Sequence, residues 1–363
     1  MPPEPKETPG ANKQATELIY PYWRGRILAI IGLLVLLLLM VVFATSIGSV
    51  EIPFATTTGI LFSKLPFVNI TPDWNSTLET IVFDIRLPRV ILAGLVGAAL
   101  ALAGATYQGL FRNPLADPYL IGVAQGAALG AVIGFLIPIS GAGMGIGLVP
   151  VLAFVGALLS VAVVYFLARV GRTVPVTTLI LAGVALGALL GAIVAYLAIT
   201  SGQLLRGIMF WLAGSFSMSQ WSEVKIVLPV IFVGAIVILL FSRMLNIMQL
   251  DEEQAQQLGI NVERLKIILL AAATMVTAAA VSFVGIIGFV GIITPHAVRL
   301  IWGPDYRFLL PLSLISGAIF LILADVLART VVAPSEIPIG VITALFGAPF
   351  FLYLLRRRAK MLF

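Results

Sequence analysis

The sequence predicts an all-α membrane protein, a polytopic bundle of about ten transmembrane helices with both termini in the cytoplasm. Of the 363 residues, 60% are hydrophobic and only 10% are charged, whereas charged residues make up about 25% of a soluble domain. The mean hydropathy is +1.11. A chain of this composition cannot cover itself with polar side chains, so lipid must be its main solvent. The absence of cysteine excludes disulfides and cysteine-ligated metal sites.

Apolar runs long enough to cross a bilayer recur along the chain. Residues 1–23 are polar and are predicted to form a disordered cytoplasmic tail. The first apolar run, 27–48, would extend about 33 Å as a helix. Because Arg24 and Arg26 precede it, we expect an uncleaved first span. The later runs lie at 87–110, 119–137, 149–168, 176–199, 224–242, 265–284, 286–301, 309–331 and 339–355.

The distribution of Lys and Arg predicts the orientation of these spans. With ten spans both termini lie on the same side, and a cytoplasmic placement puts most of the 22 basic residues there. An odd number of spans would place the cluster Arg356–Arg358 outside. The sequence therefore predicts a single ten-span domain at 24–358 and a cytoplasmic tail at 359–363. At 265–301, one long kinked segment is an alternative to two short spans.

Two segments between the spans differ from the rest. Residues 200–223 contain Trp211 and Trp221, which are typical of a membrane interface, so we expect a short helix on the outer surface. Residues 244–264 form the longest polar segment between spans, on the cytoplasmic side.

A short helix is predicted inside this cytoplasmic segment. Asp251 is its expected N-cap with Gln254 at the capping-box position, and Gly259 is its expected C′ residue. The helix is either a solvated connector or a docking surface for a cytoplasmic partner that moves the two flanking spans. The residues that would form such a surface are Asp251, Glu252, Glu253, Gln254, Ala255, Leu258 and Gly259.

Few charged residues lie within the predicted membrane-spanning segments. Asp325 and Arg329 are four residues apart and could pair on one helix face, in a structural or a functional role. Arg86, Arg89 and Arg329 are predicted at the outer ends of spans, against the positive-inside rule. Either they pair locally, for example Arg86 with Asp84, or they form a cationic rim that receives acidic groups of an external partner.

The glycine spacing and the absence of certain motifs narrow the classes of function that the chain can have. Glycines recur every fourth residue at 122–134 and 183–191, which indicates close helix packing or the lining of a path. The chain has no P-loop motif, so we expect no ATP hydrolysis by this chain and no enzyme activity. A single histidine, His296, makes a metal site improbable. An ion-coupled secondary transporter that uses Asp325 is the alternative to a partner-driven one.

Several motifs together resemble a known family, the FecCD or BtuC-like permeases of cobalamin, haem and iron–siderophore ABC importers. The resemblance covers about residues 80–358. The motifs are Arg86-Leu-Pro-Arg89, Gln108-Gly-Leu-Phe-Arg-Asn-Pro-Leu-Ala-Asp-Pro118, Leu181-Ala-Gly-Val-Ala-Leu-Gly187, Gln257-Leu-Gly-Ile260, Gly288-Phe-Val-Gly-Ile-Ile-Thr-Pro-His-Ala-Val-Arg299, Glu336-Ile-Pro-Ile-Gly-Val-Ile-Thr-Ala344 and Gly347-Ala-Pro349.

The resemblance implies a homodimer with a translocation path on its two-fold axis, lined by the fifth and tenth spans. It implies two cytoplasmic ATPase subunits, which bind ATP and Mg²⁺, and an extracytoplasmic binding protein; no cofactor is expected in this chain and no nucleic acid as a partner. The location would be a bacterial or archaeal plasma membrane. The cargo would be a metal chelate, with iron–siderophore or haem ahead of cobalamin.

The resemblance also assigns roles to residues. Residues 244–262 match the coupling helices that fit a groove on the ATPase. The positions of Arg86, Arg89 and Arg329 match arginines that receive acidic residues of the binding protein. The loop 173–178 matches a cytoplasmic gate, with Val176 and Thr177 as the candidate gate residues.

Overall fold

The computed structural model describes residues 11–48, 50–64, 71–138, 147–171 and 173–362. Within these ranges the chain is built from helices without a β-strand, and one isolated bridge joins Val170 and Thr173. The helices are α1 (Ala11–Ser46), α2 (Phe54–Ser63), α3 (Ser76–Thr80), the π-helix η1 (Ile81–Arg86), α4 (Leu87–Leu110), the 3₁₀ helix η2 (Pro118–Ile121), α5 (Val123–Leu136), α6 (Leu148–Ala168), α7 (Val176–Thr200), the 3₁₀ helix η3 (Gly202–Leu204), α8 (Leu205–Leu212), α9 (Trp221–Leu240), α10 (Ser242–Ile247), α11 (Glu252–Gln257), α12 (Val262–Val284), α13 (Val290–Trp302), α14 (Tyr306–Thr330) and α15 (Ile339–Leu362).

The prediction of a polytopic all-α membrane protein is confirmed. In the described part of the chain, seven helical segments are long and apolar enough to cross a membrane, and α5, α13 and the first part of α15 are shorter apolar helices. Each apolar run of the sequence falls on one of these helices. The number of spans and the side on which the termini lie stay predictions.

The segment at 265–301 forms two helices, not one kinked helix. α12 ends at Gly285, whose φ is 78°, and α13 follows Phe289, whose φ is 69°. A left-handed backbone at two positions cannot continue a right-handed helix, so the chain breaks here.

Part of the segment predicted to be a disordered N-terminal tail is helical, and the last helix extends into the predicted C-terminal tail. Residues 11–23, assigned to a disordered tail, belong to α1, and residues 359–362 continue α15. Helix propagation from an established apolar helix adds one hydrogen bond per residue without a new nucleation step, which explains both extensions. Residues 1–10 and 363 lie outside the described residues.

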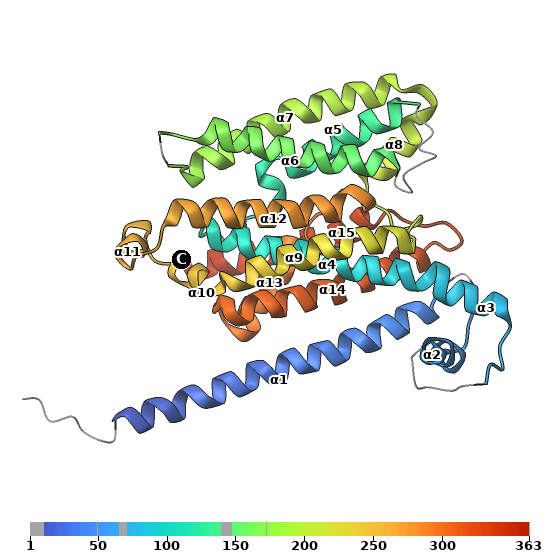
Figure 1. Ribbon diagram of the computed structural model, residues 1–363, viewed down its shortest axis with the longest axis horizontal. Helices are drawn as coiled ribbons and strands as arrows, with labels where there is room; N and C mark the ends of the chain where they lie inside the picture. The colour runs from blue at the N-terminus through green and yellow to red at the C-terminus, as the bar shows by residue number, and fades with distance from the viewer. Residues whose placement is uncertain (1–10, 49, 65–70, 139–146, 172, 363) are drawn as a thin grey trace, which may run out of the picture.

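The helices form three groups (Figure 1). α5, α6, α7 and α8 lie together on one side, α1 lies along the opposite side, and α4, α9, α12, α13 and α14 lie between. α4 is the central helix and is almost fully buried. Close backbone contacts explain this: a Cβ atom at Gly97 would overlap Gly317, and one at Gly104 would overlap Gly291. α1 instead exposes most of its apolar side chains, as a lipid-facing helix does.

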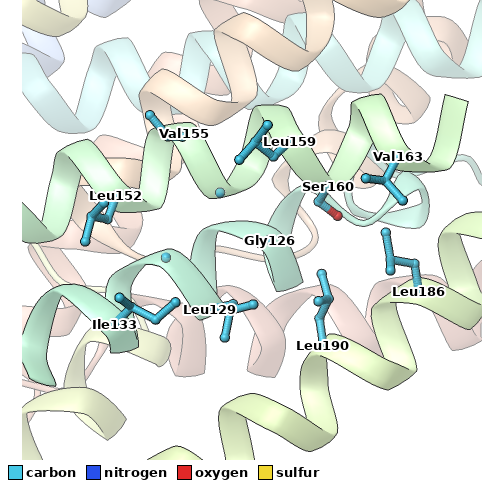
Figure 2. A pocket seen from close by; sticks show the side chains of 12 residues that line it. Gly126, Leu129, Ile133, Leu152, Val155, Leu159, Ser160, Val163, Leu186 and Leu190 are labelled. Atoms are coloured by element: carbon cyan, nitrogen blue, oxygen red, sulfur yellow. The ribbon is translucent and has the colours of Figure 1, made fainter. Parts of the chain in front are cut away.

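The glycines of α5 are packing residues. A Cβ at Gly126 would overlap the carbonyl of Gly156 on α6, and one at Gly130 would overlap that of Leu152. Beside this contact lies a groove of about 300 Å³ with an almost entirely apolar lining from α5, α6 and α7, including Leu129, Leu159 and Leu190 (Figure 2). Its one hydroxyl, on Ser160, donates to the Gly122 carbonyl at 2.9 Å. The packing interpretation is therefore confirmed for 122–134.

One end of the bundle carries α10 and α11 and the other carries α2 and α3 (Figure 1), and these are referred to as the α11 end and the α3 end. At the α11 end Asp305 caps α14 and connects three helices. Its carboxylate accepts from Asn246 of α10 at 2.7 Å and from Arg307 at 2.7 Å, and it lies 3.6 Å from Arg26 of α1. Burial acts to raise the pKa of Asp305, but these hydrogen bonds outweigh it and lower the pKa to about 2.

Acid should therefore weaken the protein through Asp305. Its pKa in the folded state is depressed below the ordinary value of 3.8, so its stabilising effect is present above about pH 4 and is lost as the pH falls toward 2. The loss should be about 1 kcal/mol, after allowance for solvent screening. Urea unfolding in detergent, compared between the parent chain and Asp305→Asn, measures this difference. An advantage over Asp305→Asn that does not shrink on acidification would contradict it.

Candidate functional site

The sequence-predicted site residues gather at the two ends of the bundle. Arg86, Arg89 and Arg329 lie at the α3 end, and the segment 251–259 lies at the α11 end with Val176 and Thr177. Between the ends lie two recesses on the side of α7 and α15.

Arg89 of α4 is the centre of a buried ion cluster at the α3 end. Its Nε and Nη2 donate to Oδ1 of Asp325 on α14 at 3.0 and 2.9 Å. Its Nη1 and Nη2 donate to the carboxylate of Glu336, just before α15, at 2.7 and 3.0 Å. Asp325 is 1% exposed. One guanidinium group therefore joins α4, α14 and the entry to α15.

The predicted pair of Asp325 and Arg329 exists, but it is the weaker contact. Arg329 Nε lies 3.5 Å from Asp325 Oδ2, one helical turn away. The sequence analysis missed Arg89 as the main partner, because Arg89 and Asp325 are 236 residues apart. Only the packing of α4 on α14 brings them together.

Arg86 and Arg329 bind the carboxyl end of α1. Arg86 donates to the carbonyl oxygens of Ser46 at 2.8 Å, Thr45 at 3.2 Å and Val50. Arg329 donates to the carbonyl oxygens of Ala44 at 2.6 Å and Ile47 at 3.0 Å. The last carbonyl groups of a helix have no partner within it and carry partial negative charge, so guanidinium donors suit them.

This arrangement corrects two expectations. Arg86 binds backbone carbonyl groups and not Asp84. The arginines are not an exposed rim either, since Arg86 and Arg329 are 5% and 9% exposed. The physical reason is that the α1 carbonyls and two carboxylates offer them partners inside the chain. Their role in docking a binding protein stays a prediction.

At the α11 end, the polar segment forms two short helices between α9 and α12. These are α10 and α11, and α11 ends as predicted at Gly259, whose φ is 84°. The N–H groups of Gly259 and Ile260 donate to the carbonyls of Gln256 and Ala255, at 2.9 and 3.2 Å. These two bonds are those of the Schellman motif, which stops a helix sharply.

The predicted capping box at the start of α11 is wrong. Asp251 occupies the N-cap position, but its side chain makes no capping hydrogen bond. It pairs instead with Arg112, which follows α4, at 3.0 Å. A charged partner competes successfully with a backbone N–H that water can also satisfy. Among the predicted coupling residues, Ala255 is buried and faces the bundle, whereas the exposed ones are Asp251, Glu253, Gln254, Leu258 and Gly259.

The predicted gate residues begin α7. Val176 is half-buried and Thr177 is exposed. The loop before them turns at Gly171, whose φ is 62°. The Thr178 hydroxyl reaches the carbonyls of Ala168 at 3.1 Å and Pro175 at 2.8 Å, which fixes the first turn of α7 to the end of α6.

Two recesses of about 570 and 680 Å³ lie beside the break between α12 and α13. Gly183, Gly187 and Gly191 of α7 line the first, so this second glycine series lines a space as well as packing. The second is lined by α15, including Val341 and Ala344. Gly288 and Phe289 line both.

The Tyr119 hydroxyl fixes the break that carries Phe289. It donates to the carbonyl of Ile287 at 2.9 Å and accepts from the N–H of the same residue at 3.2 Å. A Cβ at Gly347 of α15 would overlap the Phe289 ring, so the ring lies directly on the α15 backbone.

In the part of the chain that the structure describes, no group of three His, Cys, Asp or Glu side chains could hold a metal ion.

The model of the FecCD transport family matches residues 35–357. The chain belongs to this family. Among curated FecCD relatives, the cobalamin import system permease BtuC of Halobacterium salinarum is 50% identical over 78% of this chain and 75% of its own length. The hemin transport system permease HmuU of Yersinia pestis is 39% identical over 90% of this chain and 95% of its own.

A solved structure has the same fold as this FecCD chain. It is a metal-chelate type ABC transporter in an inward-facing conformation, 31% identical, with a TM-score of 0.78. The match covers 90% of this chain and 98% of that one. The resemblance inferred from the motifs is therefore confirmed for nearly the whole chain.

Sequence reasoning missed one further group in this FecCD protein. Lys266 of α12 is 7% exposed and contacts Glu252 of α11 and Glu263. The i, i+3 spacing of Glu263 and Lys266 was a usable signal. No sequence signal indicated that Glu252, a predicted coupling residue, would be the second partner of Lys266.

Proposed function

We propose that the chain is the membrane subunit of an ATP-binding cassette importer for a metal chelate. It works as a homodimer with two cytoplasmic ATPase subunits, and an extracytoplasmic binding protein delivers the cargo. Membership of the FecCD transport family supports this proposal. The termini and the α11 end lie in the cytoplasm, and the membrane is the plasma membrane of a bacterium or an archaeon.

The observation that carries the proposal is the geometry of α10 and α11. They form a compact projection between two long apolar helices, at one end of the bundle. α11 places Ala255 against the bundle and exposes Glu253 and Leu258. An exposed leucine beside acidic groups on a short fixed helix suits a groove on a partner protein. A partner that moves α11 would move α9 and α12 with it.

The two recesses would form part of the proposed translocation path. α7 and α15 line them, and in the proposed dimer these helices face the second copy. The lining is mostly apolar, which suits a bulky chelate with an organic shell. Relatives named for cobalamin and hemin make these two the first cargoes to test, with ferric siderophores as the third. Val176 and Thr177 close the path at the α11 end.

Docking of the binding protein belongs to the α3 end. Arg86, Arg89 and Arg329 are already paired within the chain. Acidic groups of the binding protein would therefore compete with Glu336 and the α1 carbonyls for these guanidinium groups. Docking of this kind would loosen α1 and the entry to α15.

The alternative of an ion-coupled transporter is not favoured by Asp325. A carboxylate that carries a transported ion must be free to release it. Asp325 instead accepts from Nε and Nη2 of Arg89, at 3.0 and 2.9 Å. This pairing fits a structural role.

Reconstitution tests the proposal. The chain is placed in vesicles alone, with its ATPase subunit, or with an ATPase variant that cannot hydrolyse ATP, and loaded binding protein is supplied outside. Radiolabelled cobalamin, haem and a ferric siderophore are the probes. We expect accumulation of one probe only with active ATPase and ATP. Accumulation by the chain alone, driven by a proton gradient and lost in Asp325→Asn, would overturn the proposal in favour of a secondary transporter.

A further inference from the structure

Lys266 lies between the coupling helix α11 and the loop that begins α7. We propose that Lys266 is a positioning residue that ties α11 to the predicted gate, so that a displacement of α11 moves Val174 and the start of α7. This inference rests on the proposed function, because it assigns a route to the motion that the ATPase partner would supply.

The contacts run from α11 to the loop through one ammonium group. Lys266 Nζ lies 2.9 Å from Glu252 Oε2 and 3.0 Å from Glu263 Oε1. It also donates to the Val174 carbonyl at 3.4 Å. The Val174 N–H donates to the other oxygen of Glu263 at 3.1 Å. Both backbone groups of Val174 therefore bind the charged pair on α12.

Burial of Lys266 and Val174 restricts the movement of these two residues. Lys266 and Val174 are 7% and 5% exposed. Leu110, Phe111 and Leu179 pack around the group and leave about 10 Å³ free, which is at the lower limit for one water molecule. The charges thus bind one another directly, at 2.9 and 3.0 Å, which are distances typical of charge-assisted hydrogen bonds. Lys266 is the buried member of the group and holds both carboxylates, so its removal breaks both contacts at once.

The position of Val174 explains how the link reaches the gate. Val174 precedes Pro175, which is the N-cap residue of α7, and Val176 begins the helix. Proline fixes its own φ and restricts the backbone of the residue before it. The backbone between Val174 and α7 therefore has little conformational freedom. At the other end, Glu252 is the first residue of α11. A movement of α11 would therefore act on Lys266 and, through it, on the Val174 carbonyl.

The test uses the absence of cysteine in the chain. Thr177→Cys supplies a single reporter thiol at an exposed position of α7. Its rate of labelling by a water-soluble maleimide is measured in the complete transporter, with and without ATP, using ATPase subunits that bind but do not hydrolyse ATP. The variants are Glu252→Gln, Lys266→Met and Lys266→Arg. Lys225→Met, an exposed lysine of α9, is the matched control.

We expect ATP to change the labelling rate in the parent and in Lys225→Met. In Glu252→Gln and Lys266→Met the ATP-dependent change should shrink roughly 2- to 30-fold, while the ATPase still co-purifies. Lys266→Arg should recover most of the response, since it keeps the charge and the donors. A variant that combines Glu252→Gln with Lys266→Met should respond as Lys266→Met alone does, because both changes break the same link.

The outcomes separate the two proposals. A full ATP response in Glu252→Gln and Lys266→Met would overturn the positioning role of Lys266 and leave the importer function intact. A parent chain that binds no ATPase would overturn the proposed function, and the inference with it. Glu252→Gln keeps the test valid if Lys266→Met fails to fold, because it leaves the pair of Lys266 and Glu263 in place.

Discussion

Replacing Arg89 with methionine should lower the free energy of unfolding by about 3–5 kcal/mol, the cost of breaking a buried ion pair by removal of one partner. Asp325 is 1% exposed, and Arg89 supplies its short hydrogen bonds, whereas Arg329 approaches it only to 3.5 Å. Without Arg89, the buried carboxylate would keep only the longer ion pair with Arg329, at 3.5 Å. Glu336 would also lose its partner, and the entry to α15 would lose its tie to α4.

Unfolding of the purified chain in detergent measures this effect. Arg206→Met, at an exposed position of α8, is the control and should change the stability by less than about 0.5 kcal/mol. The double variant Arg89→Met with Asp325→Leu should recover much of the loss, because it removes the stranded charge as well. A double variant as unstable as Arg89→Met alone would contradict this explanation.

Removing both Arg86 and Arg329, by substitution with methionine, should release the carboxyl end of α1. Hydrogen bonds to charged groups contribute about 1.5–3 kcal/mol each, and these two side chains supply the carbonyls of residues 44–47 with donors. This end of α1 also packs against the bundle, since Ala44 and Thr45 are fully buried, so the release should be local. We expect the loss at this site to be several kcal/mol.

Cleavage by a glutamate-specific protease at Glu51 measures the release. Glu51 is exposed just beyond α1, and protease attack requires local opening of the chain around it. The double variant should be cut faster than the parent, whereas Arg206→Met should be cut at the parental rate. Equal rates in all three proteins would show that the arginines do not fix α1.

The helices could be predicted from the sequence because their cause is local. A run such as 87–110 is long and apolar enough to cross a bilayer wherever it packs, and α4 occupies those residues. The stop at Gly259 was likewise visible, because glycine is the residue that accepts a positive φ. The break at 285–289 was not decided by the sequence, because Phe289 also adopts a positive φ there. The extension of α1 to Ala11 was not visible, since it depends on propagation from the neighbouring span.

The partners of the charged residues could not be predicted, because they are distant in the sequence. Lys266 reaches Val174 across 92 residues, and Arg89 reaches Glu336 across 247. Arg86 was expected to pair with a carboxylate, and it donates instead to backbone carbonyls of α1. The predicted cap of α11 failed for the same reason, because Asp251 pairs with Arg112, which is 139 residues away, in place of capping the helix. The sequence indicated charged residues at each end of the bundle but not the groups that they contact, and the roles of these residues stay predictions.

The glycine contacts of α4 limit how this protein can vary and move. At positions 97, 104, 291 and 317 the backbones of three helices touch, so no side chain can be accommodated there. A saturation library should retain glycine alone at these positions. Because α4, α13 and α14 pack backbone to backbone at these positions, we expect them to move as one unit. Widening of the recesses is then expected from tilting of α7 and α15 against that unit.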